Sequence, residues 1–301
     1  MPQFNFKKKQ SKIIVETAFM NEIEQLTLSV HQLGGLVVYY GTAGVGKTTT
    51  AEWITGRINT AFDHTNPDAF KSVIYQSGKI KDGNEAKKAI RAFYTAVSGT
   101  ILDEKLYWRS TVEDLADLAV HALQRNRVEI TFIDEAGLIS VDGLSGLVLI
   151  SDKARQIGYP LTMVLIGMDN LPDKLNQKHR PQLFRRVHEW CLFQHYDIND
   201  TFNLLKSIHT HFASLDPTIP LDWDQVKFIH EITGGLPGFI LPFVSRFAAQ
   251  YESYPYKVDI RLLMAINQRS INSYSGILNQ SKNNGKSITE VMETAAAKAK
   301  K

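Results

Sequence analysis

The sequence predicts an α/β fold, in which a parallel sheet is covered by helices on both faces and followed by a small all-helical domain. Two observations support this fold class. As far as about residue 197, short apolar runs alternate with segments of helical periodicity, which is typical of a doubly wound parallel sheet. Beyond that point the strand-like runs stop and apolar residues recur at helical spacing. A hydrophobic content of 44% in 301 residues suffices for one large core and a smaller satellite core.

The predicted elements follow one another along the chain. Apolar runs predict five strands, at residues 36–40, 72–76, 129–133, 161–166 and 187–193. Apolar periodicity predicts helices at residues 48–59, 84–97, 111–124, 199–211, 222–233, 239–251 and 259–270. The helix 111–124 opens with Ser110 and Glu113, whose spacing predicts a capping box.

A complete phosphate-binding motif follows the first predicted strand. Residues 41–48 read G-T-A-G-V-G-K-T, which satisfies G-x-x-x-x-G-K-[ST], and a helix is predicted directly after them. Glycines allow backbone N–H groups to surround phosphate oxygens, and the positive end of the helix points at the same anion. Lys47 is expected to reach the β- and γ-phosphates, and the Thr48 hydroxyl to bind Mg²⁺. The expected nucleotide-binding residues are Gly41, Thr42, Ala43, Gly44, Val45, Gly46, Lys47, Thr48 and Thr49.

Two adjacent carboxylates end the third predicted strand. Residues 128–136 read V-E-I-T-F-I-D-E-A, so Asp134 and Glu135 lie where the strand ends. Beside a phosphate loop, Asp134 is expected to hold Mg²⁺ through its water shell, and Glu135 to polarise the water that attacks the γ-phosphate. An Asp-Glu pair after a strand is also a common helix-capping turn. Its combination with the phosphate loop favours ATP hydrolysis.

A polar pair ends the fourth predicted strand. Residues 161–166 are followed by G-M-D-N, so that the side chain of either Asp169 or Asn170 can contact the attacking water and act as a sensor. The alternative is that both residues only cap the helix that starts near Leu171.

Two arginines, Arg185 and Arg186, stand just before the fifth predicted strand. One of them could act in trans, by inserting its guanidinium into the site of a neighbouring subunit and neutralising the charge that builds on the γ-phosphate. The alternative is a pair of solvated surface arginines.

Composition limits the other functional classes. Cys191 is the single cysteine, which excludes an internal disulfide framework, and its apolar surroundings predict a buried, inert thiol. The sequence holds no apolar run of about 18 residues and no signal-peptide core, so we expect a cytoplasmic protein without a membrane partner. A net charge of +3 is too mild to establish nucleic-acid binding by itself. The only metal expected is the Mg²⁺ that accompanies ATP.

Taken in order, these motifs resemble those of the AAA+ ATPases over roughly residues 14–270. Within that superfamily they are most similar to the bacterial transposition regulators of the TnsC, TniB and MuB group, with the secretion ATPase ExeA as a cousin. The resemblance rests on I-V-E-T at 14–17, G-T-A-G-V-G-K-T-T-T at 41–50, F-I-D-E-A at 132–136, V-L-I-G-M-D-N-L at 164–171 and L-F-R-R-V at 183–187.

The resemblance implies a P-loop AAA+ fold with a helical lid, and it assigns further roles. It makes Arg186 the arginine finger, with Arg185 as the second choice, and it places the sensor on Asp169 or Asn170. The implied catalytic residues are Glu135, Lys47, Arg186 and Asp169.

The same resemblance implies partners. Proteins of the group bind duplex DNA as ATP-dependent homo-oligomers, in rings or helical filaments, and recruit or activate a transposase together with target-selection proteins. Lys79 and Lys81, after the second strand, and Thr100, after the next helix, fall in regions that face the DNA backbone in that group. The alternatives are a helicase-loader-like or ExeA-like ATPase that acts on a protein partner, and a nucleotide-gated scaffold without catalysis.

Four regions are expected along the chain. They are a flexible basic N-terminus (1–13), an AAA+ α/β nucleotide-binding domain (14–197), a helical lid domain (198–272) and a flexible polar and basic tail (273–301). The lid departs from the pattern of many AAA+ proteins, because no arginine follows the turn at Gly234 and Gly235 until Arg246. We therefore assign no sensor 2 residue and expect slow hydrolysis that DNA or a partner stimulates.

Overall fold

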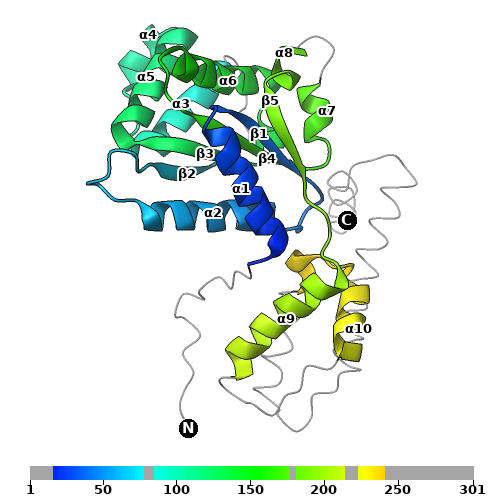
Figure 1. Cartoon of the computed structure of the whole chain (residues 1–301). Helices are drawn as coiled ribbons and strands as arrows, with labels where there is room; N and C mark the ends of the chain where they lie inside the picture. The colour runs from blue at the N-terminus through cyan, green and yellow to red at the C-terminus, as the bar shows by residue number, and fades with distance from the viewer. Residues whose placement is uncertain (1–15, 78–84, 177–180, 214–222, 241–301) are drawn as a thin grey trace, which may run out of the picture. The chain divides into compact units, whose positions relative to one another are not determined.

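The computed structural model describes residues 16–77, 85–176, 181–213 and 223–240 (Figure 1). The chain divides into two compact units, residues 1–194 and residues 195–301. The first unit contains the sheet, and the second contains the helices that follow it. The predicted boundary between sheet domain and lid, after residue 197, lies close to this division.

The sheet has five parallel strands in the order β2-β3-β4-β1-β5. The strands are β1 (Gly35–Tyr40), β2 (Lys71–Gln76), β3 (Val128–Asp134), β4 (Thr162–Gly167) and β5 (Val187–Leu192). Each lies on one of the predicted apolar runs, and the predicted fold class is confirmed. Because the strands are parallel, all of their carboxyl ends lie at one edge of the sheet and all of their amino ends at the opposite edge. We call these the carboxyl edge and the amino edge.

Helices cover both faces of this sheet (Figure 1). In the first unit α3, α5 and α6 pack on one another over one face, whereas α1 packs on the central strands from the other face and α2 on β2. The helical elements of the unit are α1 (Ala18–His31), α2 (Lys47–Ala61), α3 (Glu85–Ser98), α4 (Glu104–Arg109), α5 (Val112–Asn126), the 3₁₀ turn η1 (Ala136–Leu138), α6 (Val141–Gln156), α7 (Leu171–Leu175) and α8 (Pro181–Phe184).

Strand β1 shows why its apolar run is continuous rather than alternating. Leu36 and Val38 belong to the core cluster formed with α3, α5 and α6. Val37 and Tyr39 are equally buried but lie outside that cluster, and the Tyr39 hydroxyl shares a hydrogen bond with Thr27 of α1. Each face of the strand therefore meets a helical layer, and both sets of side chains must be apolar or internally satisfied.

The capping box at the start of α5 differs from the predicted one. Thr111, not Ser110, is the N-cap: its Oγ1 accepts from the Asp114 N–H at 3.1 Å, and the Asp114 carboxylate accepts from the Thr111 N–H at 2.8 Å. Ser110 belongs to the preceding helix α4, because its Oγ donates to the Leu106 carbonyl at 2.7 Å. The predicted box of Ser110 and Glu113 is wrong by one residue, because α4 was not predicted and ends on Ser110.

The second unit contains α9 (Ile198–Ala213) and α10 (Trp223–Thr233) among its described residues. They are joined by a hydrogen bond of 2.9 Å between Thr201 Oγ1 and His230 Nδ1, and by packing of the Phe202 ring on Trp223. The predicted helix 259–270 and the tail 273–301 lie outside the described residues, as does all but the start of the predicted helix 239–251.

Cys191 is buried, as predicted, and burial raises the pKa of its thiol to about 12. In the described part of the chain, no helix combines the length and the apolar character that crossing a membrane requires.

Thr111→Ala should lower the free energy of unfolding by about 1 kcal/mol, because it removes the side-chain acceptor of an otherwise unpaired N–H and opens the capping box. Glu113→Ala is the matched control. It removes an exposed acid one residue away from the box and should change the same quantity by less than about 0.5 kcal/mol. Urea titration followed by circular dichroism measures the free energy of unfolding of both variants. A larger decrease in Glu113→Ala than in Thr111→Ala would contradict the box of Thr111 and Asp114 and favour that of Ser110 and Glu113.

Candidate nucleotide-binding site

The loop after β1 has the backbone shape that its glycines predict. Gly41 and Gly46 have φ angles of +150° and +101°, in the region that favours glycine. A Cβ atom on Gly41 would lie 2.4 Å from the carbonyl oxygen of Phe193, so no other residue fits there. The loop therefore leaves β1 at the carboxyl edge and turns directly into α2, which begins at Lys47.

The first turn of α2 offers unpaired backbone donors to this loop. Its N-cap is Gly46, which has no side chain to accept a hydrogen bond from the first-turn N–H groups. The helix is 15 residues long, and its positive end adds to those donors. Backbone N–H groups and a helix N-terminus at one place form a site for an anion such as a phosphate.

Lys47 is folded back into the loop. Its Nζ donates to the carbonyl oxygens of Gly41 at 2.6 Å and Thr42 at 2.7 Å, and the residue is only 8% exposed. Burial lowers the pKa of Lys47 to about 8, while the negative charges of Asp169 and Asp134 act in the opposite direction. The Lys47 ammonium therefore lies inside the phosphate loop, where it can balance the negative charge of a bound phosphate.

Thr48 and Asp134 meet at the same place. The Thr48 hydroxyl donates to Asp134 Oδ2 at 2.9 Å, although the two residues stand on α2 and at the end of β3. A hydroxyl and a carboxylate side by side are ligands that suit Mg²⁺, which takes its remaining ligands from water and from phosphates. The donor set therefore fits the predicted ion, and no larger cluster of His, Cys, Asp or Glu gathers among the described residues.

Glu135 is held in an unusual backbone conformation. Its φ and ψ of 54° and 34° lie in the left-handed region, which non-glycine residues seldom adopt. Its N–H donates to Asp134 Oδ1 at 2.9 Å, and the hydroxyl of Ser77 donates to the carbonyl oxygens of Asp134 and Glu135, both at 2.8 Å. The Glu135 side chain is exposed at the carboxyl edge, as its predicted role requires.

Ser77 is a site residue that sequence reasoning missed. It directly follows β2, whose last residue Gln76 pairs with Asp134 in the parallel register. Its hydrogen bonds join residues 57 and 58 positions apart, so no local pattern in the sequence indicates them. These two hydrogen bonds to backbone carbonyls help to fix the backbone that carries Glu135.

The polar pair after β4 is only partly explained by capping. Asn170 is the N-cap residue of α7, yet its side chain makes no capping hydrogen bond. Asp169 contributes the largest of the charge interactions that favour the Lys47 ammonium, which associates it with the phosphate loop. Lys174, also missed, donates from α7 to the Gly137 carbonyl at 2.6 Å and so ties α7 to the turn after Glu135. The sensor role of Asp169 or Asn170 remains a prediction.

The two arginines are not brought into this site. They precede β5, whose first residue Val187 pairs with Leu36 at the start of β1, and so they lie at the amino edge. Arg186 forms an ion pair with Asp152 of α6. Neither arginine belongs to the set formed by Lys47, Thr48 and Asp134 within one copy of the chain.

Only one of the three predicted DNA-contact residues, Thr100, lies in the described part of the chain. Lys79 and Lys81 lie outside it. Thr100 is exposed just beyond the end of α3, and its N–H donates a hydrogen bond to the Ser98 hydroxyl at 3.1 Å.

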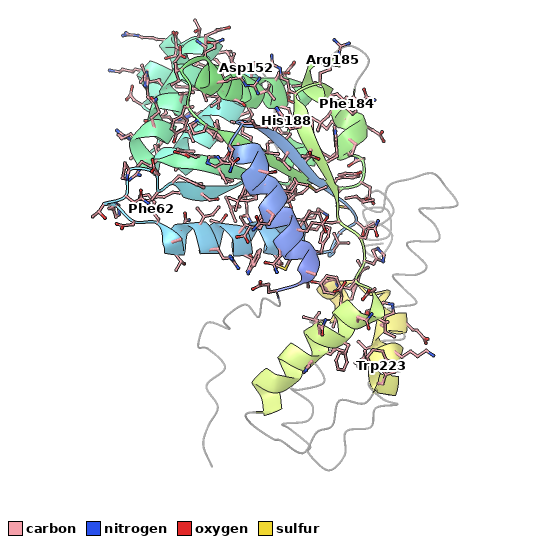
Figure 2. All side chains as sticks on the ribbon, viewed as in Figure 1. Phe62, Asp152, Phe184, Arg185, His188 and Trp223 are labelled. Carbon is pink, nitrogen blue, oxygen red and sulfur yellow. The ribbon has the colours of Figure 1, made fainter. Side chains whose placement is uncertain are left out.

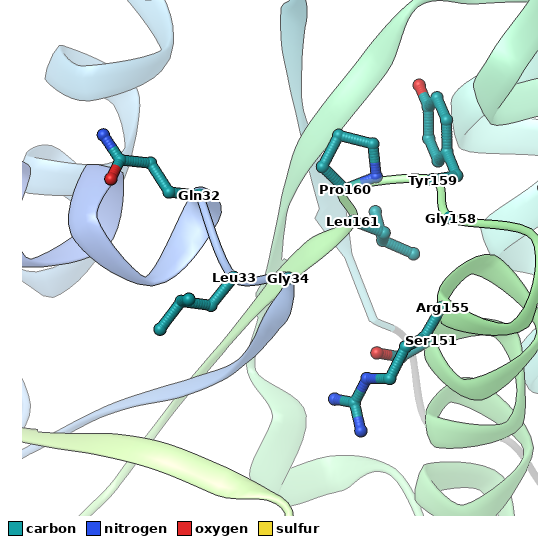
Figure 3. A pocket seen from close by; sticks show the side chains of 9 residues that line it. All are labelled: Gln32, Leu33, Gly34, Ser151, Arg155, Gly158, Tyr159, Pro160 and Leu161. Carbon is teal, nitrogen blue, oxygen red and sulfur yellow. The ribbon is translucent and has the colours of Figure 1, made fainter.

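A hollow of about 150 Å³ opens at the amino edge, between the end of α1 and the start of β4 (Figure 3). Its wall includes Leu33, Pro160 and Leu161, and α6 adds the polar side chains of Ser151 and Arg155. Residues of its lining come just before β1 and β4 in the chain, whereas the phosphate loop comes just after β1. The two features therefore lie at opposite edges of the sheet.

Comparison with known proteins supports the fold. Residues 30–175 match the family model described as the AAA domain. No curated protein sequence matches the chain.

Three solved structures show the same kind of fold at low sequence identity. The ORC2 protein of Aeropyrum pernix in ADPNP–ADP complexes has a TM-score of 0.62 at 13% identity, over 85% of this chain and 69% of that chain. A Walker-type ATPase of Pyrococcus abyssi has a TM-score of 0.58 at 14% identity, over 90% and 76%. Drosophila ORC bound to DNA has a TM-score of 0.55 at 14% identity, over 92% and 72%. Together with the parallel five-stranded sheet, these similarities show that the chain has the P-loop AAA+ fold.

Lys47 should make the stability of the fold depend on pH. Because its pKa of about 8 lies below the ordinary value of 10.5, the unfolded chain holds this proton more tightly, and the cost of burying the charge is fully present below pH 8. As the pH rises from 8 to 10.5 that cost disappears, and the folded state gains about 1–3 kcal/mol.

The measurement is the difference in free energy of unfolding between the chain and its Lys47→Met variant, since the titration of all other groups cancels in this difference. A difference that stays constant from neutral pH to 10.5 would show that burial does not perturb Lys47.

Proposed function

We propose that this chain is an ATP-hydrolysing, DNA-binding AAA+ protein that assembles into homo-oligomers on duplex DNA and regulates transposition. The observation that carries the proposal is the meeting of Lys47, Thr48 and Asp134 at the carboxyl edge, beside an exposed Glu135. These groups come from two distant segments of the chain, and together they match the needs of a magnesium-bound triphosphate.

Each residue has a defined task in this proposal. The loop N–H groups and Lys47 bind the phosphates, and Lys47 exchanges its two carbonyl partners for phosphate oxygens. Thr48 and Asp134 hold Mg²⁺, which when bound supplies charge neutralisation to the phosphates. Glu135 orients a water molecule and accepts its proton, because its carboxylate is exposed while its backbone is fixed.

DNA binding is supported by two independent features. The sequence resembles the transposition regulators, in which the regions of Lys79, Lys81 and Thr100 face the duplex. A structure with the same fold, Drosophila ORC, is one bound to DNA. Lysine and hydroxyl contacts to phosphate give affinity without sequence preference and a strong dependence on salt.

Regulation of transposition rests on the motif strings, above all F-I-D-E-A at 132–136 and L-F-R-R-V at 183–187. Recruitment of a transposase and of target-selection proteins follows from the same resemblance. The second candidate is a helicase-loader-like or ExeA-like ATPase acting on a protein partner, and the similar fold of domain III of the Thermotoga maritima replication initiation protein DnaA favours keeping it. Stimulation of phosphate release by duplex DNA alone supports the first function. A requirement for a protein partner, with no effect of DNA, supports the second.

Glu135→Gln should separate assembly from hydrolysis. The amide keeps the size of the side chain but cannot accept a proton, so phosphate release should fall at least about a hundred-fold. Assemblies on duplex DNA should persist with ATP, because nucleotide binding does not use this carboxylate. Lys47→Ala, the comparison variant, should lose both properties.

Phosphate release and negative-stain microscopy with duplex DNA measure these two properties, with ADP and a non-hydrolysable ATP analogue as the nucleotide controls. Ordered assemblies that form equally well with ADP would contradict the dependence on the γ-phosphate. Normal hydrolysis by Glu135→Gln would remove this residue from the chemistry.

Lys79→Ala with Lys81→Ala should weaken DNA binding and make it less dependent on salt. If both lysines contact phosphates, the slope of log K against log salt should become shallower by about two. Thr100→Ala should lower affinity without changing that slope, since its hydroxyl carries no charge. Nucleotide binding, measured by calorimetry, should be unaffected in both variants. An unchanged slope in the double-lysine variant would exclude this segment from the DNA contact.

A further inference from the structure

The hollow at the amino edge contains a buried hydroxyl that nothing in the fold uses. Ser151 of α6 is only 7% exposed and lines the hollow, yet its Oγ has no hydrogen-bond partner among the described residues. Ser145 on the same helix shows the usual alternative, because its Oγ donates to the Val141 carbonyl at 2.8 Å. A buried hydroxyl without a partner costs free energy, so such groups are nearly always paired. Ser151 therefore offers a donor to something that enters the hollow.

A charged donor stands beside this hydroxyl. Arg155 follows Ser151 by four positions on α6, so both side chains lie on one face of the helix. Both line the hollow, and in Figure 3 both extend from α6 on the side that faces Gly34. The Arg155 guanidinium forms no ion pair or hydrogen bond with any residue that the structure describes. Two donors thus converge on one space.

The acid nearest to Arg155 along the helix is engaged elsewhere. Asp152 lies on α6 and faces the turn before β5 (Figure 2), where it forms an ion pair with Arg186. Among the described residues, no acidic side chain lines the hollow. The positive charge of Arg155 is therefore not neutralised by a neighbour within the hollow.

The remaining walls are apolar. Leu33, Pro160 and Leu161 contribute aliphatic surface, and Tyr159 adds its ring. The hydroxyl of Tyr159 is bonded to two carbonyl oxygens outside the hollow, at 3.1 and 3.0 Å. A group that fills the hollow must therefore be apolar on one side and carry its polar atoms toward α6.

The backbone donors around the hollow are already used. The N–H groups of Gly34, Gly158 and Leu161 donate to carbonyl oxygens at 3.1, 3.0 and 2.8 Å, and Pro160 has no N–H. A phosphate group presents three acceptor oxygens and is usually held by several such donors. A carboxylate has two oxygens, which one guanidinium fork and one hydroxyl can satisfy.

We propose that the hollow is a binding site for a carboxylate carried on a short apolar body, in which Arg155 pairs with the carboxylate and Ser151 donates to it. The apolar body lies against Leu33, Pro160 and Leu161. A volume of about 150 Å³ suits a body of benzene size. The same chemistry occurs in a free aliphatic or aromatic acid and in the last residue of a peptide chain.

This site is independent of the proposed function. The six residues of β1 separate the hollow from the phosphate loop by about 20 Å. None of the residues that line the hollow belongs to the loop, to Asp134 or to Glu135. Nucleotide binding therefore serves as a control for correct folding in every variant below.

Benzoate and benzamide form a matched pair of probes, because they share size and shape but only benzoate carries a charge. NMR titration of the full-length chain should show benzoate binding with a dissociation constant on the order of 1 mM, a usual value for so small a ligand. Benzamide should bind at least about tenfold more weakly, since it cannot pair with a guanidinium.

Three variants assign the contacts. Arg155→Ala should weaken benzoate binding at least about tenfold and leave benzamide binding unchanged. Lys153→Ala removes a positive charge from the same helix, outside the hollow, and should change benzoate affinity less than about twofold. Ser151→Ala should weaken benzoate about threefold or more without destabilising the ligand-free chain, because its hydroxyl has no hydrogen bond to lose there.

A tripeptide that ends in leucine distinguishes the two sources of the carboxylate. If the free acid binds more tightly than benzoate and its C-terminal amide does not, the hollow takes the end of a peptide chain. If benzoate binds more tightly than the peptide, the hollow takes a small free acid.

Four results would overturn the proposal. They are equal affinity for benzamide and benzoate, unchanged benzoate affinity in Arg155→Ala, tighter binding of inorganic phosphate than of benzoate, and no binding of either benzoate or the peptide acid. Failure of the unmodified chain to bind or hydrolyse ATP would refute the proposed function and leave the carboxylate site untouched.

Discussion

The candidate site depends on one constraint, the parallel register of β3, β4 and β1. Tyr40 pairs with Gly167, and Ile133 pairs with Leu165, so the three strands end almost level. Strand β4 lies between the other two, which separates β1 from β3 by about 10 Å. Only α2, starting at the end of the loop after β1, brings Thr48 across that gap to Asp134. A shift of one strand by a single residue would move every one of these groups.

Holding the site in this form costs free energy that the core must offset. The Lys47 ammonium is largely buried, and Glu135 has a left-handed backbone, which costs on the order of 1–2 kcal/mol in a non-glycine residue. Hydrogen bonds from Ser77 to two successive carbonyls, and from Lys174 to the turn beyond, stabilise this arrangement. The strained backbone is that of Glu135, whose carboxylate is exposed at the carboxyl edge.

Local sequence patterns could predict the parts of the site that are contiguous, and they failed where distant segments meet. The phosphate loop and Asp134 were found because a strand and its following turn suffice to identify them. The hydrogen bonds of Ser77 and Lys174 join residues 58 and 37 positions apart, which no local pattern encodes. The ion pair of Arg186 with Asp152 is likewise non-local. Spacing could therefore place two arginines before β5 without separating an anchored residue from an exposed one.

The same register has a consequence for assembly. Within one copy, the phosphate loop lies at the carboxyl edge and Arg185 at the amino edge, so a contact between them joins two different surfaces. Such a heterologous contact uses one surface of each partner and leaves the other available for the next copy. A pair related by a two-fold axis would have to bring both edges into one self-complementary patch, across about 20 Å of strand. If the arginine finger that the resemblance implies, Arg186 or Arg185, meets the nucleotide of a second copy, this arrangement favours head-to-tail addition. Such addition yields a ring when the rotation per subunit closes and a helical filament when it does not.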